Sequence, residues 1–320
     1  MPATPFAPRP LGPGGPLVPP LGLGSWNTWD RMSEQDAVAI VQRAVAAGAG
    51  FFDVAYYNMG PHAENSRTDI LFGNALRASG APREQVFLCG KLWLWDWPRQ
   101  GFRAQLEESL ERAGLDRFDA VVVGDYLASP DLPALVGEVE ELRRDGLFAQ
   151  WGINNWRIDD TRGAIRVAGD TGAAAPAFAQ LKYSIARRAM AEGEPYRRLF
   201  QAGVLGLQAS DVFEGGILAG KLVPARKIGA DVGGIRERIV AVYPGLERIA
   251  ADFGATPAQL AVAFCLADPH VANVLFGASS LSQLEGNLVA LELAARDGAA
   301  LREALAGLQQ DTEVAADGTW

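Results

Sequence analysis

Short apolar runs alternate along the chain with longer stretches whose apolar residues recur at helical spacing. Residues 33–47 show the helical spacing, with Ser33 as a predicted N-cap and Asp36 three residues later. Gly48 follows at the position where a left-handed cap ends a helix. Phe51–Ala55 is the apolar run that comes next, and it predicts a strand.

The same alternation continues to the end of the chain. The first strand is expected at 21–24, and later strands at 86–91, 118–123, 149–153, 177–181, 204–209 and 271–276. Further helices are expected at 68–79, 101–113, 131–144, 159–167, a stretch ending at 201, 235–253, 256–267 and 279–294. Strands separated by helices indicate a parallel sheet with right-handed crossovers.

Two architectures have this element order, a doubly wound sheet and a closed barrel. A doubly wound sheet is usually marked by G-x-G-x-x-G leading into a helix, and Leu21–Gly24 is not followed directly by a helix. We therefore predict an α/β fold, a (β/α)8 TIM barrel, as a single domain over 1–320. Residues 1–20 are expected to form an extended lead-in or short hairpin, and 311–320 a loose tail over the barrel mouth.

Composition narrows the functional classes. Hydrophobic residues make up 49% of the chain, enough for a large core, and the formal net charge of −9 disfavours nucleic acid and anionic membranes as partners. No apolar run approaches the roughly 20 residues that span a bilayer, and the first residues lack a secretory pattern, so a cytoplasmic location is expected. Cys89 and Cys265 lie in apolar runs and are expected to be buried and reduced. We expect a small-molecule substrate and no metal.

Barrel active sites are built at the carboxyl ends of the strands, which directs attention to Asp53 and Lys91. Each lies at the end of a predicted strand, and together they form either an acid–base pair or a structural ion pair. Trp93, Trp95 and Trp97 alternate after Lys91. Because they are expected to begin past the strand end, we interpret the three tryptophans as a substrate-pocket wall rather than as one face of the core, with Trp93 and Trp95 as the substrate contacts.

Gly277, Ala278 and Ser279 stand between the last predicted strand and a helix. Free backbone N–H groups and the positive end of a helix favour a phosphate at such a place, and small residues let it approach. An ordinary N-cap at Ser279 or Ser280 is the alternative. Gln283 and Asn287, on the same helical face, favour the phosphate interpretation.

Six segments in order resemble those of aldo-keto reductases. They are Leu21–Trp26 (LGLGSW), Phe52–Ala55 (FDVA), Gly152–Trp156 (GINNW), Gln180–Tyr183 (QLKY), Gly215–Lys221 (GGILAGK) and Phe276–Ser280 (FGASS) with Gln283 and Asn287. The resemblance covers nearly the whole chain and implies a nicotinamide dinucleotide, NADP with NAD as the alternative.

The resemblance also implies roles for individual residues. Asn154, Asn155 and Gln180 would bind the nicotinamide carboxamide, and Trp26 would face the substrate. The remaining cofactor contacts would come from Gly216, Leu218, Gly220, Lys221, Gly277, Ser279, Gln283 and Asn287. The position of the aromatic residue on which the nicotinamide usually stacks falls near Ser210, so the ring would need another platform or would be held less firmly.

The family's catalytic tetrad of Asp, Tyr, Lys and His is altered. Asp53 and Lys91 match, but the Tyr position falls at Asn58, whose amide cannot deliver a proton. A one-residue shift of the loop would bring Tyr57 into the role. The His position falls at Gly124, with Asp125 next to it.

The chain has only two histidines. His62 follows Asn58 on the catalytic side and is a candidate site residue, with a solvated loop histidine as the alternative. His270 precedes the last strand, at the barrel's bottom, and is interpreted as structural.

Three functions remain open at this point. The first is an NAD(P)H-dependent oxidoreductase for a dedicated carbonyl or hydroxyl substrate, with Tyr57, His62 or Asp125 as the rearranged donor. The second is a cofactor-binding barrel that catalyses a non-standard step, an elimination or epimerisation. The third is a non-catalytic binding or regulatory homologue, as in the potassium-channel β-subunits that resemble the family.

Overall fold

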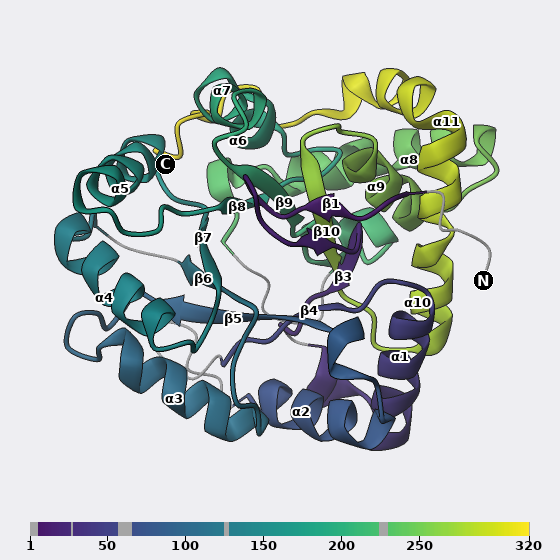
Figure 1. The fold of residues 1–320 in the computed structure, drawn as a ribbon. Coiled ribbons are helices and arrows are strands. Elements are labelled where there is room, and N and C mark those ends of the chain that lie inside the picture. The colour runs from purple at the N-terminus through teal and green to yellow at the C-terminus, as the bar shows by residue number, and fades with distance from the viewer. Residues whose placement is uncertain (1–5, 27, 57–65, 125–127, 224–229, 320) are drawn as a thin grey trace.

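Parallel strands close into a barrel with helices outside it, as predicted (Figure 1). The computed structural model describes residues 6–26, 28–56, 66–124, 128–223 and 230–319. The barrel strands are β3 (Leu21–Leu23), β4 (Phe51–Asp53), β5 (Phe87–Trp93), β6 (Ala120–Gly124), β7 (Gln150–Asn154), β8 (Phe178–Lys182), β9 (Gly206–Ser210) and β10 (Val271–Phe276). The sheet closes where β10 pairs with β3.

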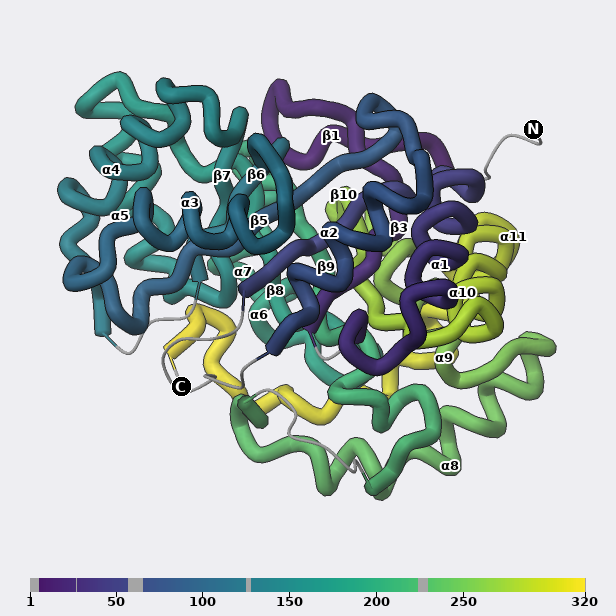
Figure 2. Tube along the Cα trace, turned by 90° about the horizontal axis from the view of Figure 1, so that it is seen from below, coloured from purple at the N-terminus to yellow at the C-terminus, as the bar shows by residue number. Residues whose placement is uncertain are grey.

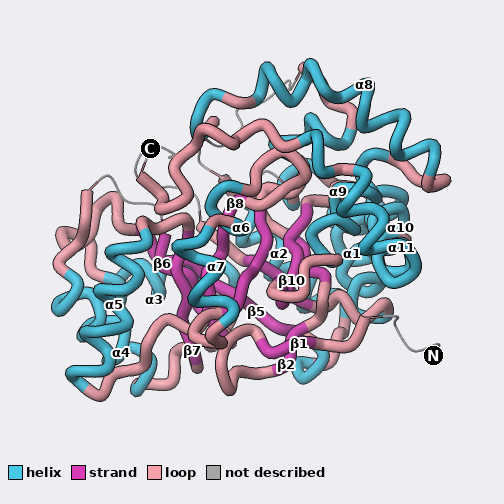
Figure 3. Tube along the Cα trace, turned by 90° about the horizontal axis from the view of Figure 1, so that it is seen from above, coloured by secondary structure: helices cyan, strands magenta, loops and turns pink. Residues whose placement is uncertain are grey.

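Helices surround the strands on the outside (Figure 3). They are α1 (Glu34–Ala46), α2 (Thr68–Ser79), α3 (Phe102–Ala113), α4 (Leu132–Arg144), α5 (Ile158–Thr171), α6 (Ala189–Glu192), α7 (Glu194–Gln201), α8 (Arg236–Asp252), α9 (Pro257–Leu266), α10 (Leu281–Leu288) and α11 (Ala290–Ala304). The predicted caps are confirmed: the Ser33 side chain accepts from the Asp36 N–H, and Thr256 forms a capping box with Gln259.

A short antiparallel hairpin, β1 (Arg9–Pro10) with β2 (Leu17–Val18), closes the amino-terminal end of the barrel. Arg9 Nη1 donates to the carbonyl of Val271 at 2.5 Å, at the start of β10. Leu11 and Val18 pack with Phe51 and other inward-facing apolar residues of the strands. The lead-in therefore forms the predicted hairpin, and it seals the end opposite the strands' carboxyl termini.

Two expectations about elements are wrong. The single helix predicted at 279–294 is two helices, α10 and α11, which meet at Val289 and continue to Ala304. On either side of this break, α10 contributes Gln283 and Asn287 to the carboxyl end of the barrel, and α11 packs along α9. The strand predicted at 86–91 also continues, since β5 pairs with β6 as far as Trp93 and Gly124. Trp93 is thus the last residue of a strand and does not begin past its end.

The carboxyl-terminal tail, expected as a loose cover over the barrel mouth, reaches that mouth at Gly318 and is held by hydrogen bonds. Asp311 Oδ2 accepts from the N–H groups of Arg188 and Ala189 at the start of α6, both at 2.7 Å. The Asp317 carbonyl accepts from the Ile158 N–H at 2.8 Å, at the start of α5. These bonds satisfy donors that a helix start leaves open, and they run the tail past α6 and α7 (Figures 1 and 2).

Candidate active site

One large cavity, of about 820 Å³, opens at the carboxyl ends of the barrel strands. The predicted site residues that line it are Trp26, Asp53, Lys91, Trp93, Trp95, Asn154, Asn155, Gln180, Ser210, Gly216, Lys221, Gly277, Ser279, Gln283 and Asn287. Leu218 is instead buried in the apolar core, and Gly220 ends the short helix η4 (Glu214–Ala219) in a left-handed conformation. Tyr57, Asn58, His62 and Asp125 lie outside the described residues.

Asp53 and Lys91 form a buried ion pair in the cavity. Lys91 Nζ lies 3.4 Å from Asp53 Oδ2, and the two side chains are only 9% and 6% exposed. Burial raises the pKa of the Asp53 carboxyl, and the Lys91 ammonium partly opposes that shift. Asp53 Oδ1 has no hydrogen-bond partner among the described residues. The pair therefore places a cation at the cavity, while the unpartnered Asp53 Oδ1 is itself buried behind the surface.

An aromatic wall stands beside this pair. The rings of Trp93 and Trp95 stack with centroids 4.4 Å apart and planes 9° from parallel. Lys91 Nζ lies 5.6 Å from the centroid of the Trp93 ring, within cation–π range. Trp93 Nε1 donates to the Tyr56 carbonyl at 2.9 Å, which fixes the ring's orientation. Both tryptophans line the cavity as predicted, Trp93 from the end of the strand and Trp95 from beyond it.

Amide side chains line another part of the cavity. Asn154 ends β7, Gln180 lies in β8, and Asn154 Nδ2 donates to Gln180 Oε1 at 2.5 Å. Asn155 follows with φ 51°, a left-handed conformation that Asn tolerates. Ser210 ends β9, and its hydroxyl donates to the Leu181 carbonyl at 3.0 Å. The position that the resemblance assigns to a ring thus carries a short hydroxyl, and Phe213, three residues later, lines the cavity.

The loop from Gly277 to Ser280 joins β10 to α10 at the edge of the cavity. Ser280 caps α10, and its Oγ accepts from the Gln283 N–H at 3.2 Å. Gln283 Oε1 in turn accepts from the Ser279 N–H at 2.8 Å. The N-cap and the cofactor interpretation are therefore compatible, because the capping residue is Ser280 while Ser279 and Gln283 line the cavity.

Charged residues that the sequence analysis did not select also line the cavity. Lys182 ends β8 and Asp211 directly follows β9, and their side chains pair at 3.0 Å. The Lys182 ammonium lowers the pKa of Asp211 against the opposing effect of burial. Arg31 and Arg157 line the cavity as well. The strand-end rule that found Asp53 and Lys91 would also have found Lys182 and Asp211.

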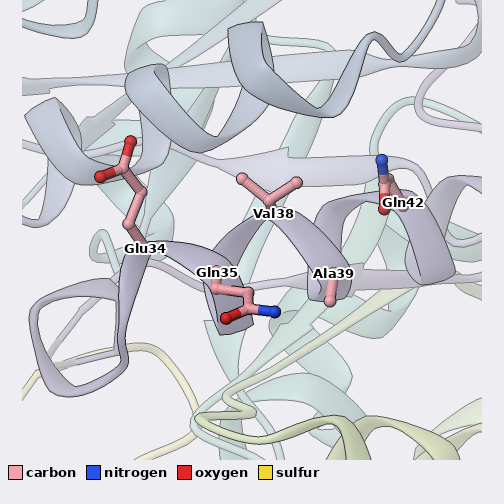
Figure 4. Close-up of a pocket in the computed structure, with 5 residues that line it drawn as sticks. All are labelled: Glu34, Gln35, Val38, Ala39 and Gln42. Atoms are coloured by element: carbon pink, nitrogen blue, oxygen red, sulfur yellow. The ribbon is translucent and has the colours of Figure 1, made fainter.

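A second depression lies on the outer face of α1 and has a different character. Glu34, Gln35, Val38, Ala39 and Gln42 line it, all from one helix (Figure 4). No group there is positioned for acid–base chemistry. Among the described residues no cluster of three or more His, Cys, Asp or Glu could hold a metal ion.

No single helix of the described residues is long and apolar enough to cross a membrane. The pair α8 and α9 passes the same test of length and composition, but the two helices are bent by 81°.

Three further expectations can be compared with the structure. Cys89 and Cys265 are both free and buried, as predicted, and burial raises the pKa of each thiol. His270 precedes β10 at the closed end, far along the strand from the cavity, as expected. Trp97 does not join the wall of Trp93 and Trp95, because its Nε1 donates to Glu138 Oε2 at 2.8 Å on α4.

Comparison with known proteins decides the family. The model of the aldo/keto reductase family matches residues 20–306. The chain belongs to this family. A relative from Oryza sativa subsp. japonica, described as a probable voltage-gated potassium channel subunit beta, is 28% identical and aligns over 88% of this chain and 90% of its own. A protein of the same description from Arabidopsis thaliana is 26% identical with the same coverage.

A solved structure shows the same fold in another family member. It is an aldo-keto reductase from Klebsiella pneumoniae in complex with NADPH, with a TM-score of 0.70 and 23% sequence identity. The alignment covers 93% of this chain and 95% of the other.

Proposed function

We propose that this aldo/keto reductase is an NAD(P)H-dependent oxidoreductase that acts on a carbonyl or hydroxyl group of a dedicated small-molecule substrate. The observation that carries the proposal is the composition of one cavity. It joins a buried Lys–Asp pair and a tryptophan wall to a set of amides and to the backbone at the start of α10. The Lys–Asp pair and the tryptophan wall suit a reacting polar group on a flat substrate. The amides and the backbone at the start of α10 suit a dinucleotide.

The residues present fit a nicotinamide dinucleotide. Asn154 and Gln180 offer amide donors and acceptors to a carboxamide. Lys182 and Lys221 line the cavity as cations for phosphate, and Gly216, with φ 105°, lets the backbone turn tightly beside it. NADPH is the preferred form, consistent with the NADPH held by the Klebsiella relative.

When bound, the dinucleotide supplies or accepts the hydride. Reduction of a carbonyl group would also require one proton on the carbonyl oxygen. Lys91 stabilises the negative charge that grows on the oxygen, and Asp53 holds the ammonium in place. The tryptophan wall orients the substrate and excludes water.

The proton donor is rearranged in this proposal, because Asn58 stands where the family has its phenol. Tyr57 is the first candidate, and His62 and Asp125 are the others. We expect Tyr57→Phe to abolish turnover and leave cofactor binding intact. A fully active Tyr57→Phe beside an inactive His62→Ala would assign the proton to His62. If both variants are active, Asp125, water or the substrate must provide it.

The test has two stages. Calorimetric titration with NADPH and NADH measures binding, and a screen of carbonyl substrates then measures cofactor oxidation by absorbance. We expect binding, with poor activity on common aldehydes and ketones and good activity on a narrow set. The absence of heat with either dinucleotide at millimolar concentration would contradict the cofactor assignment.

The plant relatives favour a second candidate, a dinucleotide-binding subunit of a larger assembly. Both carry names of potassium channel β subunits and align over most of their length. Tight dinucleotide binding without hydride transfer to any substrate would support this candidate, or an elimination or epimerisation, over the reductase.

A further inference from the structure

Amide side chains from neighbouring strands and from Asn155, which follows β7, form a continuous hydrogen-bonded row, here called the amide chain; all but Asn155 are buried. In it Asn155 Nδ2 donates to Asn154 Oδ1 (3.0 Å), Asn154 Nδ2 to Gln180 Oε1 (2.5 Å), Gln180 Nε2 to Gln208 Oε1 (2.9 Å) and Gln208 Nε2 to Asn273 Oδ1 (2.9 Å). The register of β7 to β10 places these residues side by side, with Asn154 opposite Gln180, Gln180 opposite Gln208, and Gln208 opposite Asn273. The amide chain thus starts in the cavity and crosses the barrel interior.

Its ends determine its direction. At one end the backbone N–H of Lys182, which can only donate, donates to Asn155 Oδ1 at 2.8 Å. At the other end the carbonyl of Pro19, which can only accept, receives a bond from Asn273 Nδ2 at 2.8 Å. Turning any interior amide around would place donor against donor on one side and acceptor against acceptor on the other. Every amide therefore has one allowed orientation.

Packing alone does not explain Gln208 and Asn273. Both are 0% exposed, in a barrel interior where branched apolar side chains are usual. A buried polar group is costly unless it is paired, and among the described residues these two side chains are paired with other members of the amide chain and, for Asn273, with the Pro19 carbonyl.

The amide chain leaves a defined set of groups for a ligand. It uses one N–H and one oxygen lone pair of each interior amide, so Asn154 and Gln180 each keep one donor and one acceptor. These two residues line the cavity, whereas Gln208 and Asn273 do not. A ligand carboxamide has the complementary pair, one carbonyl and one amino group.

We propose that Gln208 and Asn273 are positioning residues that hold Asn154 and Gln180 in the single orientation that binds the nicotinamide carboxamide. This inference rests on the proposed function. Neither residue touches the ligand. Their effect reaches it through the fixed orientation of Gln180, and it should be larger for Gln208, which bonds to Gln180 directly.

The experiment compares two probes, NADPH and ADP-ribose 2′-phosphate, which lacks the nicotinamide ring. The variants are Gln208→Met and Asn273→Leu, which keep the side-chain size and remove the hydrogen bonds. The control is Tyr196→Phe on α7, which removes a buried hydroxyl that donates to the Trp156 carbonyl at 2.8 Å and does not line the cavity. Calorimetry measures both affinities for each protein.

We expect Gln208→Met to weaken NADPH binding about tenfold, the scale of one lost hydrogen bond, and Asn273→Leu to weaken it less. The affinity for ADP-ribose 2′-phosphate should not change, which also shows that the variants are folded. Tyr196→Phe should change neither affinity. Wild-type affinity of Gln208→Met for NADPH, or equal losses for both probes, would overturn this inference alone. A wild-type protein that binds neither probe would overturn the proposed function together with it.

Discussion

At the residue scale, the Asp53–Lys91 pair is buried at a cost in stability that its proposed part in the chemistry would explain. Burial raises the pKa of Asp53 even with Lys91 beside it, so the folded barrel favours the protonated carboxyl more than water does. Among the described residues Lys91 is the one ion-pair partner of that carboxylate, and replacing Lys91 removes it. We predict that Lys91→Met lowers turnover by about 10²-fold or more, the usual scale for groups that handle a proton. Steady-state kinetics on the best substrate of the screen measures this.

The pH dependence of stability follows from the sign of the shift. A carboxyl whose folded pKa is raised favours the fold below its ordinary value of 3.8 and loses that contribution as the pH rises through the folded pKa. Lys91→Met should therefore be least stable, relative to the wild type, near neutral pH. The double variant Lys91→Met with Asp53→Asn should recover the thermal midpoint and remain inactive, because no buried charge is left unpaired. Near-normal turnover in Lys91→Met would show that the pair is structural.

The sequence alone identifies the residues of the ion pair but not those of the amide chain, because only the former are marked by their position along the strand. Asp53 and Lys91 lie at strand ends, where parallel strands bring side chains together, so their position alone marks them. Gln208 and Asn273 are single polar residues inside apolar strands, and only the register shows that they bond to one another. The sequence does contain a weak indication of these two residues, since each is an isolated amide in a run that is otherwise typical of a buried strand.

At the scale of elements, Glu140 joins α4 to the connection between α5 and β8. Its carboxylate bonds to Arg143 and Arg144 and accepts from the Ala174 N–H at 3.0 Å. Chiefly through Arg143, these bonds lower the pKa of Glu140 from 4.5 to about 2. Its contribution is present above pH 4.5 and is lost as the pH falls through the folded pKa of about 2.

We predict that Glu140→Gln lowers the free energy of unfolding at neutral pH by about 1–2 kcal/mol, reduced from the full pKa shift for screening by solvent. The difference from the wild type should shrink between pH 4.5 and 2. Denaturant titrations at several pH values measure it. Glu141→Gln is the matched control, since Glu141 is 68% exposed and pairs only with a surface arginine. A pH-independent difference for Glu140→Gln would contradict the assignment.

Element boundaries were predictable where a local signal sets them. Ser33 and Thr256 start their helices through their own side chains, so their sequence neighbourhood is sufficient. The break at Val289 has no such signal, because Val289 keeps right-handed helical backbone angles and its side chain makes no capping hydrogen bond to α11. The position of the tail also has no local signal in the sequence. Asp311 and Asp317 are fixed only by accepting hydrogen bonds from backbone N–H groups at the starts of α6 and α5, which are distant in the sequence.

At the scale of the whole molecule, the barrel separates stability from chemistry along its axis. The hairpin seals the amino-terminal end and packs on Phe51, Phe178 and Leu275, while the cavity occupies the carboxyl end. The division is characteristic of TIM barrels, and it was predictable once the strand order was known. The seal depends on close backbone contact that sequence cannot show. A Cβ on Gly206 would lie 1.9 Å from the Leu11 carbonyl oxygen, and one on Gly12 would lie 2.1 Å from that of Ala177.

This geometry predicts that Gly206→Ala weakens the barrel without altering the site. The added methyl cannot coexist with the Leu11 carbonyl, so the hairpin must shift, at a cost of about 1–3 kcal/mol for an overpacked contact. We expect a thermal midpoint lower by several degrees and an unchanged affinity for NADPH. Gly137→Ala on α4 is the control, because nothing lies within 4 Å of its new Cβ, and it should keep or raise the midpoint. Scanning calorimetry with and without NADPH separates the two effects.

A Gly206→Ala protein that keeps its midpoint would show that the hairpin does not support the barrel. One that loses NADPH affinity would show that the closed end and the cavity are coupled, with the bond from Asn273 to Pro19 as the most direct path between them.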